Sequence, residues 1–471
     1  MNIIKFLSSK GIDTIDSAFY KKIEEWNSWY ISNVRSFSSY RVYSGRGTYT
    51  KRRRKSLGMA KKVCEDIADL LLNEKVKITL SDEKTASYVN QVLRDNNFKT
   101  KGNECQERKA ATGTVAYVPY LYDMNVDQNG TVLSGKIKIN YVSAKDIYPV
   151  SWDNGTVYEA IFALRKTVKR KKYVNFQYHH IENGQYVIEN MVVVADQSSE
   201  GHELTEQEWR QLKPFRNMAA KIETGSLEPQ FVIDKLNKVN NTDEDESNPM
   251  GVALFSNSID ILKSLDIKYD SYCNEFELGK KRLFVAPEMI KNVDGSPAFD
   301  PDDSVFYQLP EDYDKEGTGL IKEVDMELRT EDHSKAINDD LNYLSMKCGF
   351  GTERYRFEKG QVKTATEVIS VNSDMFRSLK KHENVLDDAI KELVRIIIRL
   401  GIVLGEPLNM DSETTIDFDD SIIEDKTAER ESDRKDVAMG AMTLEEYRGK
   451  WYGETEEQAK KNIQEPAGVI E

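Results

Sequence analysis

VALFSNSIDILKSLDIKYDSYCNEFEL, residues 252–278, is the stretch that decides the fold. Its large apolar side chains recur every three or four positions, as on one face of an α-helix: Phe255, Ile259, Leu262, Leu265, Tyr269, Tyr272 and Phe276. A second stripe of this kind falls in 328–348 and consists of Ile337, Leu341, Leu344 and Cys348. Two amphipathic helices therefore bracket residues 279–327, whose prolines and short β-rich runs predict a small insertion of strands.

Upstream of this stretch, residues 1–250 combine helical and strand patterns. An amphipathic stripe predicts a helix between Ile15 and Tyr30, and three more helices are expected at 56–73, 85–95 and 103–111. Strands are expected where β-branched and aromatic residues cluster, at 115–122, 136–142, 157–168 and 186–194. Asn-Gly turns separate these runs, which predicts an antiparallel sheet and an α+β fold class.

Downstream of the second helix, a polar loop at 349–363 leads into one long helix. Thr364 and Glu367 have the spacing of a capping box, in which each side chain satisfies a free backbone donor. Helical patterning then continues to about residue 400, which corresponds to roughly 55 Å of helix. The end of the chain is acidic, because residues 411–471 hold 18 acidic and 8 basic side chains and so contribute −10 of the net charge of −14.

Composition and charge narrow the classes of function. A chain of 471 residues is long enough for several domains, and its net charge of −14 argues against a protein that wraps DNA, since such proteins carry clustered Lys and Arg. The first residues show no secretory pattern, and the longest apolar cluster, 393–404, is too short and too charged to span a bilayer. A soluble protein made in the cytoplasm is therefore expected. The four scattered cysteines predict buried, reduced thiols rather than disulfides or a zinc site.

No motif in the chain points to catalysis. The nucleotide-binding, zinc-protease and nucleophile-elbow patterns are all missing, and none of the five histidines has a partner at metal-ligand spacing. His179 and His180 fall in a strand pattern, so one ring is expected to face inward and the other outward. Asp417, Asp419 and Asp420 have the chemistry to bind Mg²⁺, but no basic side chains accompany them, which favours a solvated acidic surface.

The basic run KRRRK at 51–55 leaves two interpretations. It contacts nucleic acid or an acidic partner, or it is a solvated surface. The second interpretation is favoured, because most runs of charged residues form solvated surface.

Several strings resemble the portal proteins of tailed phages that infect Gram-positive bacteria. DIYPVSWDNG at 146–155 is similar to the family's wing. Three further strings are similar to the start of the family's stem: SNPMG (247–251), NSID (257–260) and LDIKYD (265–270). Residues 321–329 resemble the end of its clip, and TATEV (364–368) with NSD (372–374) resembles the start of its long helix. The tail strings DSII (420–423), EEYR (445–448) and GETEE (453–457) are also similar, so the resemblance covers most of the chain and is weakest at 196–228.

The resemblance implies a portal fold assembled as a ring. Its expected parts are a β-rich wing (1–250), a two-helix stem (251–278 and 328–348), a small α/β clip (279–327), a tunnel loop (349–363), a long wing helix (364–405) and a helical crown (406–471). About twelve subunits would surround a channel at one capsid vertex, through which double-stranded DNA enters and leaves. The implied partners are further copies of the chain, the major capsid protein and scaffold, the terminase large subunit and head–tail adaptor or connector proteins. The implied location is the virion, after assembly in the host cytoplasm, with no cofactor, metal, membrane or enzymatic activity.

The tunnel loop holds the candidate DNA contacts: Arg354, Tyr355, Arg356, Phe357, Lys359 and Lys363. Its basic side chains outnumber its two glutamates, and its two aromatic rings either contact DNA or pack against the loop of a neighbouring subunit. Two other classes of protein stay open. One is a metal-dependent enzyme acting on nucleic acid through the Asp417 cluster, and the other is a monomeric adaptor that binds phage proteins.

Overall fold

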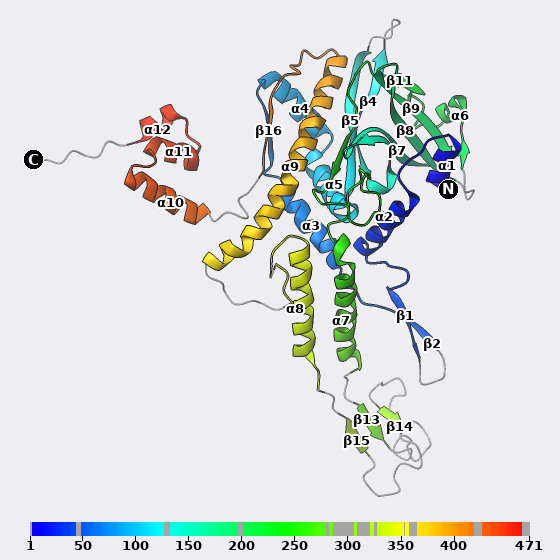
Figure 1. Cartoon of the computed structure of the whole chain (residues 1–471), viewed down its shortest axis with the longest axis vertical. Coiled ribbons are helices and arrows are strands. Elements are labelled where there is room, and N and C mark those ends of the chain that lie inside the picture. Colours follow the sequence, from blue (N-terminus) through cyan, green and yellow to red (C-terminus); the bar gives the residue numbers. More distant parts are fainter. Residues whose placement is uncertain are drawn as a thin grey trace, which may run out of the picture.

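The computed structural model describes residues 2–43, 49–126, 132–195, 201–278, 282–285, 306–308, 321–324, 327–352, 354–357, 365–418 and 426–463. Helices and sheets are both abundant, which confirms the α+β class. Figure 1 shows a body of sheets and helices from which two helices, α7 (Ile259–Leu278) and α8 (Thr330–Lys347), run out side by side.

Helices of the N-terminal region pack around one hydrophobic core. They are α1 (Ile3–Ser9), α2 (Ser17–Tyr30), α3 (Met59–Leu71), α4 (Glu83–Asp95) and α5 (Phe98–Thr112). The stripe predicted in the first long helix is the buried face of α2, where Phe19, Ile23 and Trp26 are nearly inaccessible. Between α2 and α3, a hairpin of β1 (Ser39–Tyr43) and β2 (Tyr49–Arg53) leaves the body and lies along α7.

Two antiparallel sheets fill the centre of the body. The larger runs β6 (Ile147–Asp153), β7 (Thr156–Val168), β8 (Lys171–Glu182) and β9 (Gln185–Val194), with β10 (His202–Glu203) and β11 (Lys221–Glu223) both on β9. Helix α6 (Glu206–Arg210) follows β10. The second sheet has the order β12 (Val232–Lys235), β4 (Thr114–Val126), β5 (Val132–Ser143). At 154–155 and 183–184 both Asn-Gly residues have positive φ, as a two-residue hairpin requires.

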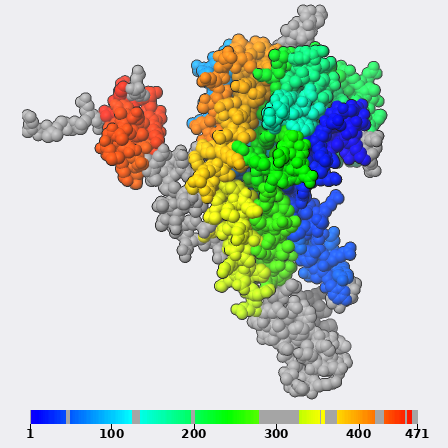
Figure 2. All heavy atoms as spheres, in the orientation of Figure 1, coloured from blue at the N-terminus to red at the C-terminus, as the bar shows by residue number. Residues whose placement is uncertain are grey.

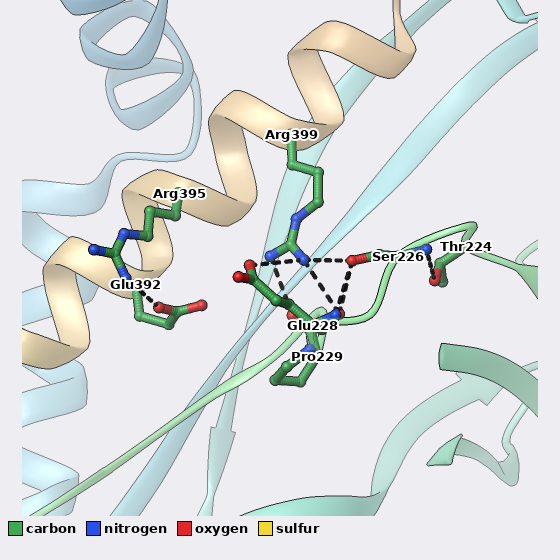
Figure 3. Close-up of polar contacts among 7 residues, drawn as sticks. All are labelled: Thr224, Ser226, Glu228, Pro229, Glu392, Arg395 and Arg399. Atoms are coloured by element: carbon green, nitrogen blue, oxygen red, sulfur yellow. Dashed lines mark hydrogen bonds and ion pairs between the residues drawn. The ribbon is translucent and has the colours of Figure 1, made fainter. Parts of the chain in front are cut away.

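Helix α9 (Ala365–Val403) crosses the body beside both β4 and β12. Near its end, Arg399 binds the loop between β11 and β12 (Figure 3). Its Nη1 donates to Ser226 Oγ at 2.6 Å and to the Glu228 carbonyl at 3.2 Å, and its Nη2 donates to the Pro229 carbonyl at 3.3 Å. The long helix is therefore joined to the β11–β12 loop by polar contacts, in addition to its apolar packing beside β4 and β12.

After α9 the chain returns to the body. Strand β16 (Thr414–Asp417) pairs with β3 (Lys77–Leu80) in a separate two-stranded sheet, so this part of the expected crown is joined to the N-terminal region. Helices α10 (Lys426–Met439), α11 (Leu444–Tyr452) and α12 (Glu456–Asn462) then form a small group, in which Trp451 Nε1 donates to Asp433 at 2.8 Å. In the expected clip, β13 (Arg282–Val285) lies between β14 (Phe306–Gln308) and β15 (Ile321–Val324).

Candidate functional site

One side of α7 faces α8 and is joined to it by charged side chains. Lys268 Nζ lies 2.7 Å from Asp340, and Arg329 Nε donates to Glu275 at 2.8 Å. His333 Nε2 lies 3.3 Å from the same Glu275 oxygen. Because a helix turns by about 100° per residue, positions 268 and 275 share one side of α7.

The opposite side of α7 holds two aspartates that are nearly buried. Asp266 Oδ1 accepts from the Leu57 amide at 2.9 Å, and burial raises the pKa of this carboxyl group. Asp270 Oδ2 accepts from the Tyr40 hydroxyl at 2.8 Å, and its Oδ1 accepts from the Lys55 amide at 3.0 Å. The expected stem thus has three layers, because the hairpin segment (39–43 and 49–57), α7 and α8 lie in that order (Figure 1).

The predicted stripe of α7 is buried only where the helix leaves the body. Phe255, Leu262 and Leu265 are buried, and Ile259, Tyr269 and Tyr272 are half-buried. Phe276, at the far end, is exposed. On α8, all three predicted positions are buried: Ile337, Leu341 and Leu344. The stem helices therefore share a core only near the body.

Gly349 turns the chain from α8 toward α9. Its φ is +82°, and a Cβ at this position would lie 2.2 Å from Ser378 Oγ on α9. Both the backbone conformation and the close approach therefore require glycine. This contact holds the start of the expected tunnel loop against the long helix.

Both aromatic side chains of the expected tunnel loop pack against residues of their own chain. Tyr355 is buried with its ring 5.9 Å from that of Phe350, and burial raises its pKa well above the usual value. The Phe357 amide donates to Asn338 Oδ1 at 2.6 Å, and its ring lies 5.4 Å from that of Tyr272. Each ring thus has a partner in its own chain, and a contact with DNA or with a neighbouring loop stays a prediction.

The basic residues of the loop behave differently. Arg354 and Arg356 are exposed. Lys359, Lys363 and Thr364 lie outside the described residues, and only the backbone of Glu367 is described, as part of α9. The capping box is therefore beyond what the structure describes.

A family model for "Phage portal protein, SPP1 Gp6-like" matches residues 9–467. The chain belongs to this family of phage portal proteins. A search of curated proteins found no match. Membership confirms the resemblance to portal proteins and makes the chain a structural, non-enzymatic phage protein. It also implies, in general terms, a ring at a capsid vertex with capsid and terminase as partners, whereas the Gram-positive host stays a prediction.

The portal protein's acidic and histidine clusters agree with a structural role. His179 is buried between Phe162 and Phe231, and burial lowers its pKa to about 3, whereas His180 is half-buried and stacks on Tyr178. The prediction of one ring inward and one outward is therefore confirmed. Asp417 is exposed on β16 opposite Lys77, and Asp419 and Asp420 lie outside the described residues.

Among the described residues of the portal protein, one group of three potential metal ligands converges, namely His180, Glu182 and Glu189. Lys221 already lies 2.5 Å from Glu182 and 4.0 Å from Glu189, so a cation of the protein itself balances this acidic pair. None of the described helices has both the length and the apolar character needed to cross a membrane.

Sequence reasoning missed the attachment of the hairpin segment to the stem of the portal protein. The residues involved are Tyr40, Lys55 and Ser56 on one side and Asp266 and Asp270 on the other. The available signal was a pair of aspartates four positions apart on a helix with an apolar stripe, since such aspartates need donors when they are buried.

Proposed function

We propose that the chain assembles into a closed ring of about twelve subunits that forms the DNA channel at one capsid vertex. The observation that supports this most strongly is the surface of the stem. Four large side chains on α7 and α8, Ile267, Phe276, Tyr343 and Met346, have between 46% and 57% of their surface exposed. Neighbouring subunits in a ring would cover them, which an isolated monomer does not do.

The oligomeric state tests this proposal and separates it from the monomeric adaptor. Native mass spectrometry of the purified chain, at the salt concentration of capsid assembly, should give closed rings. Monomers alone under these conditions would argue against the ring and favour the adaptor.

We propose that residues 349–363 line the narrowest part of the channel, where DNA slides past during packaging and ejection. The two ordered aromatic rings and Gly349 hold the loop on its own subunit, while Arg354 and Arg356 stay exposed. A modest positive charge in an otherwise acidic protein attracts phosphates without gripping them. Replacing Arg354, Arg356 and Lys359 by Ser should reduce DNA packaging or retention and leave ring assembly unchanged. Full-length genomes packaged and held as by the wild type would refute this role.

We propose that the clip, 279–327, docks the terminase large subunit and later the head–tail connector proteins. Its strands are only three to four residues long, too short for an independently stable sheet, so strands of neighbouring subunits or partners would complete it. Deleting 289–299 should abolish packaging and leave the wing folded. Normal packaging by the deletion variant would refute the assignment.

We propose that the acidic end of the chain forms a crown that faces the capsid interior and keeps the channel mouth clear of packaged DNA. The negative charge of residues 411–471 supports this through repulsion of phosphates. Replacing Asp417, Asp419 and Asp420 by Asn should alter the length of packaged genome or the assembly. If neither changes, the charge serves solubility alone.

A further inference from the structure

The β1–β2 hairpin has an inner and an outer face. Tyr40 and Val42 are half-buried, and Tyr40 binds Asp270 on α7. Since side chains alternate along a strand, residues 41 and 43 point the other way, and both are exposed. The register pairs Arg41 with Lys51 and Tyr43 with Tyr49, so the outer face consists of Arg41, Tyr43, Tyr49, Lys51 and Arg53.

This outer face is basic and aromatic, and it lacks partners among the described residues. Arg54 and Lys55, which follow the hairpin, are engaged: Arg54 lies over the Phe37 ring and Lys55 pairs with Glu277. No described acidic side chain pairs with Arg41, Lys51 or Arg53. The rings of Tyr43 and Tyr49 lie 5.3 Å apart and form an exposed pair at the far end of the hairpin.

The outer face of α8 has the complementary character. Its buried positions are Ile337, Leu341 and Leu344, and about 100° of rotation per residue places residues 332, 339 and 343 on the opposite side. The exposed side chains there are Glu331, Asp332, Lys335, Asp339, Tyr343 and Met346. Three carboxylates thus accompany one lysine and two large apolar side chains, and no described basic residue pairs with these carboxylates.

The two faces lie on opposite flanks of the stem. The hairpin binds the side of α7 that holds Asp266 and Asp270, and α8 binds the side that holds Lys268 and Glu275. In Figure 2 the hairpin (blue) and α8 (yellow) flank the stem at a similar level along the long axis. Rotational symmetry requires this placement, because neighbours in a ring meet through two different surfaces.

We infer that the outer face of the hairpin docks on the outer face of α8 in the next subunit, and so joins neighbouring stems around the ring. This inference rests on the proposed ring. Opposite charges bring the surfaces into register, and the tyrosine pair would cover Tyr343 and Met346 of the neighbour. The N-terminal hairpin therefore acts as an intersubunit clasp at the level of the stem.

Charge reversal tests the clasp with two matched variants. Arg41→Glu with Lys51→Glu makes the hairpin acidic, and Asp332→Lys with Asp339→Lys makes α8 basic. Each variant alone should lose closed rings in native mass spectrometry. An equal mixture of the two should regain rings in which the variants alternate, and a chain carrying all four substitutions should form rings alone. The control is Lys171→Glu with Lys172→Glu, at two exposed positions of β8. It has the same change in charge as the hairpin variant and should keep its rings.

A second measurement uses the wild-type ring and does not depend on the folding of any variant. Carbodiimide treatment followed by mass spectrometry should give a link between subunits from Lys51 to Asp332 or Asp339. The inference is overturned if wild-type rings give no such link, or if both reversed variants form rings as the wild type does. It is also overturned if the hairpin variant forms normal rings but no longer packages DNA, since the hairpin would then face DNA or the packaging machinery. A wild type without rings would instead refute the proposed function itself.

Discussion

The Tyr40 hydroxyl donates a hydrogen bond of 2.8 Å to the Asp270 carboxylate across 230 residues of sequence. It joins the N-terminal hairpin to the first stem helix, together with the backbone donors of Lys55 and Leu57 on the same side of α7. Because Asp270 and its neighbour Asp266, which binds the Leu57 amide, are both nearly buried, these donors replace the water that the two carboxylates give up on folding. The hairpin is therefore a fixed part of the stem.

Removing this bond should loosen the hairpin. Tyr40→Phe should lower the free energy of unfolding by about 1 to 2 kcal/mol, since a hydrogen bond to a charged and buried acceptor is lost. It should also speed proteolytic cleavage within 41–53. Tyr43→Phe is the control, because this exposed ring makes no described hydrogen bond and should leave both quantities unchanged. Equal cleavage rates for the two variants would contradict the anchoring role.

The fully buried ion pair of Lys109 and Asp234 predicts a large effect of single substitutions. Lys109 Nζ lies 2.8 Å from Asp234 Oδ1, neither side chain has exposed surface, and Gln106 donates to the other carboxylate oxygen at 2.8 Å. Asp234→Ala leaves a buried charge without a partner and should cost about 3 to 5 kcal/mol in urea unfolding. Adding Lys109→Met should recover much of this loss. A single variant that costs less than about 1 kcal/mol would show that the pair is solvated.

Two buried histidines predict a loss of stability in mild acid. Burial lowers the pKa of His179 and of His382 to about 3, and the His382 ring accepts a hydrogen bond from the Asn237 amide through Nδ1. In the unfolded chain each histidine binds a proton near pH 6.5, whereas in the folded chain it stays neutral down to about pH 3. The free energy of unfolding is therefore highest above about pH 6.5 and falls as the pH is lowered toward 3. At about pH 5, each histidine should cost roughly 2 kcal/mol relative to neutral pH.

His179→Phe checks this assignment, because the ring nitrogens have no hydrogen-bond partner and Phe162 and Phe231 surround the site. The variant should fold. Below about pH 6.5, the slope of its unfolding free energy against pH should be smaller by the contribution of one bound proton. An unchanged slope would mean that His179 does not titrate between the folded and unfolded states as argued.

Alanine substitutions at Gly349 and Gly405 should distinguish the cost of backbone strain from the cost of a steric clash. Both have positive φ, but a Cβ meets Ser378 only at Gly349, since nothing lies within 4 Å at Gly405. Gly405→Ala should cost about 1 kcal/mol through its backbone conformation alone. Gly349→Ala should cost clearly more, and Ser378→Ala in the same chain should recover part of the difference in thermal unfolding. Equal costs at the two glycines would contradict the close approach of the loop to α9.

Arg399 and Arg395 offer a similar comparison on the long helix (Figure 3). Arg399 reaches the Ser226–Pro229 loop, whereas Arg395 pairs with Glu392 of its own helix at 3.5 Å. Arg399→Ala should cost about 1 to 2 kcal/mol, because several carbonyl and hydroxyl acceptors lose their donor. Arg395→Ala should cost less than about 0.5 kcal/mol, as exposed pairs on one helix do. Urea unfolding compares the two, and a reversed order would contradict the anchoring of α9 through Arg399.

Local patterns determined much of the fold. The apolar stripes of 252–278 and 328–348 predicted α7 and α8, and the Asn-Gly turns at 154–155 and 183–184 predicted hairpins that the structure contains. These features depend on neighbours three or four positions away on a helix, or two on a strand, so the order of residues is sufficient to reveal them. The order of the family strings likewise predicted the portal family, which the family match over residues 9–467 confirms.

Only the tertiary structure decided which distant segments meet. The third layer of the stem joins Tyr40 to Asp270, strand β16 pairs with β3 across the length of the chain, and Lys109 finds Asp234 in the core. Such contacts leave no periodic trace in the sequence, because each depends on how whole elements pack. For the same reason the packing of Tyr355 against Phe350, and of Phe357 against Tyr272 on α7, could not be predicted from the sequence, which offered both rings as candidates for DNA contact.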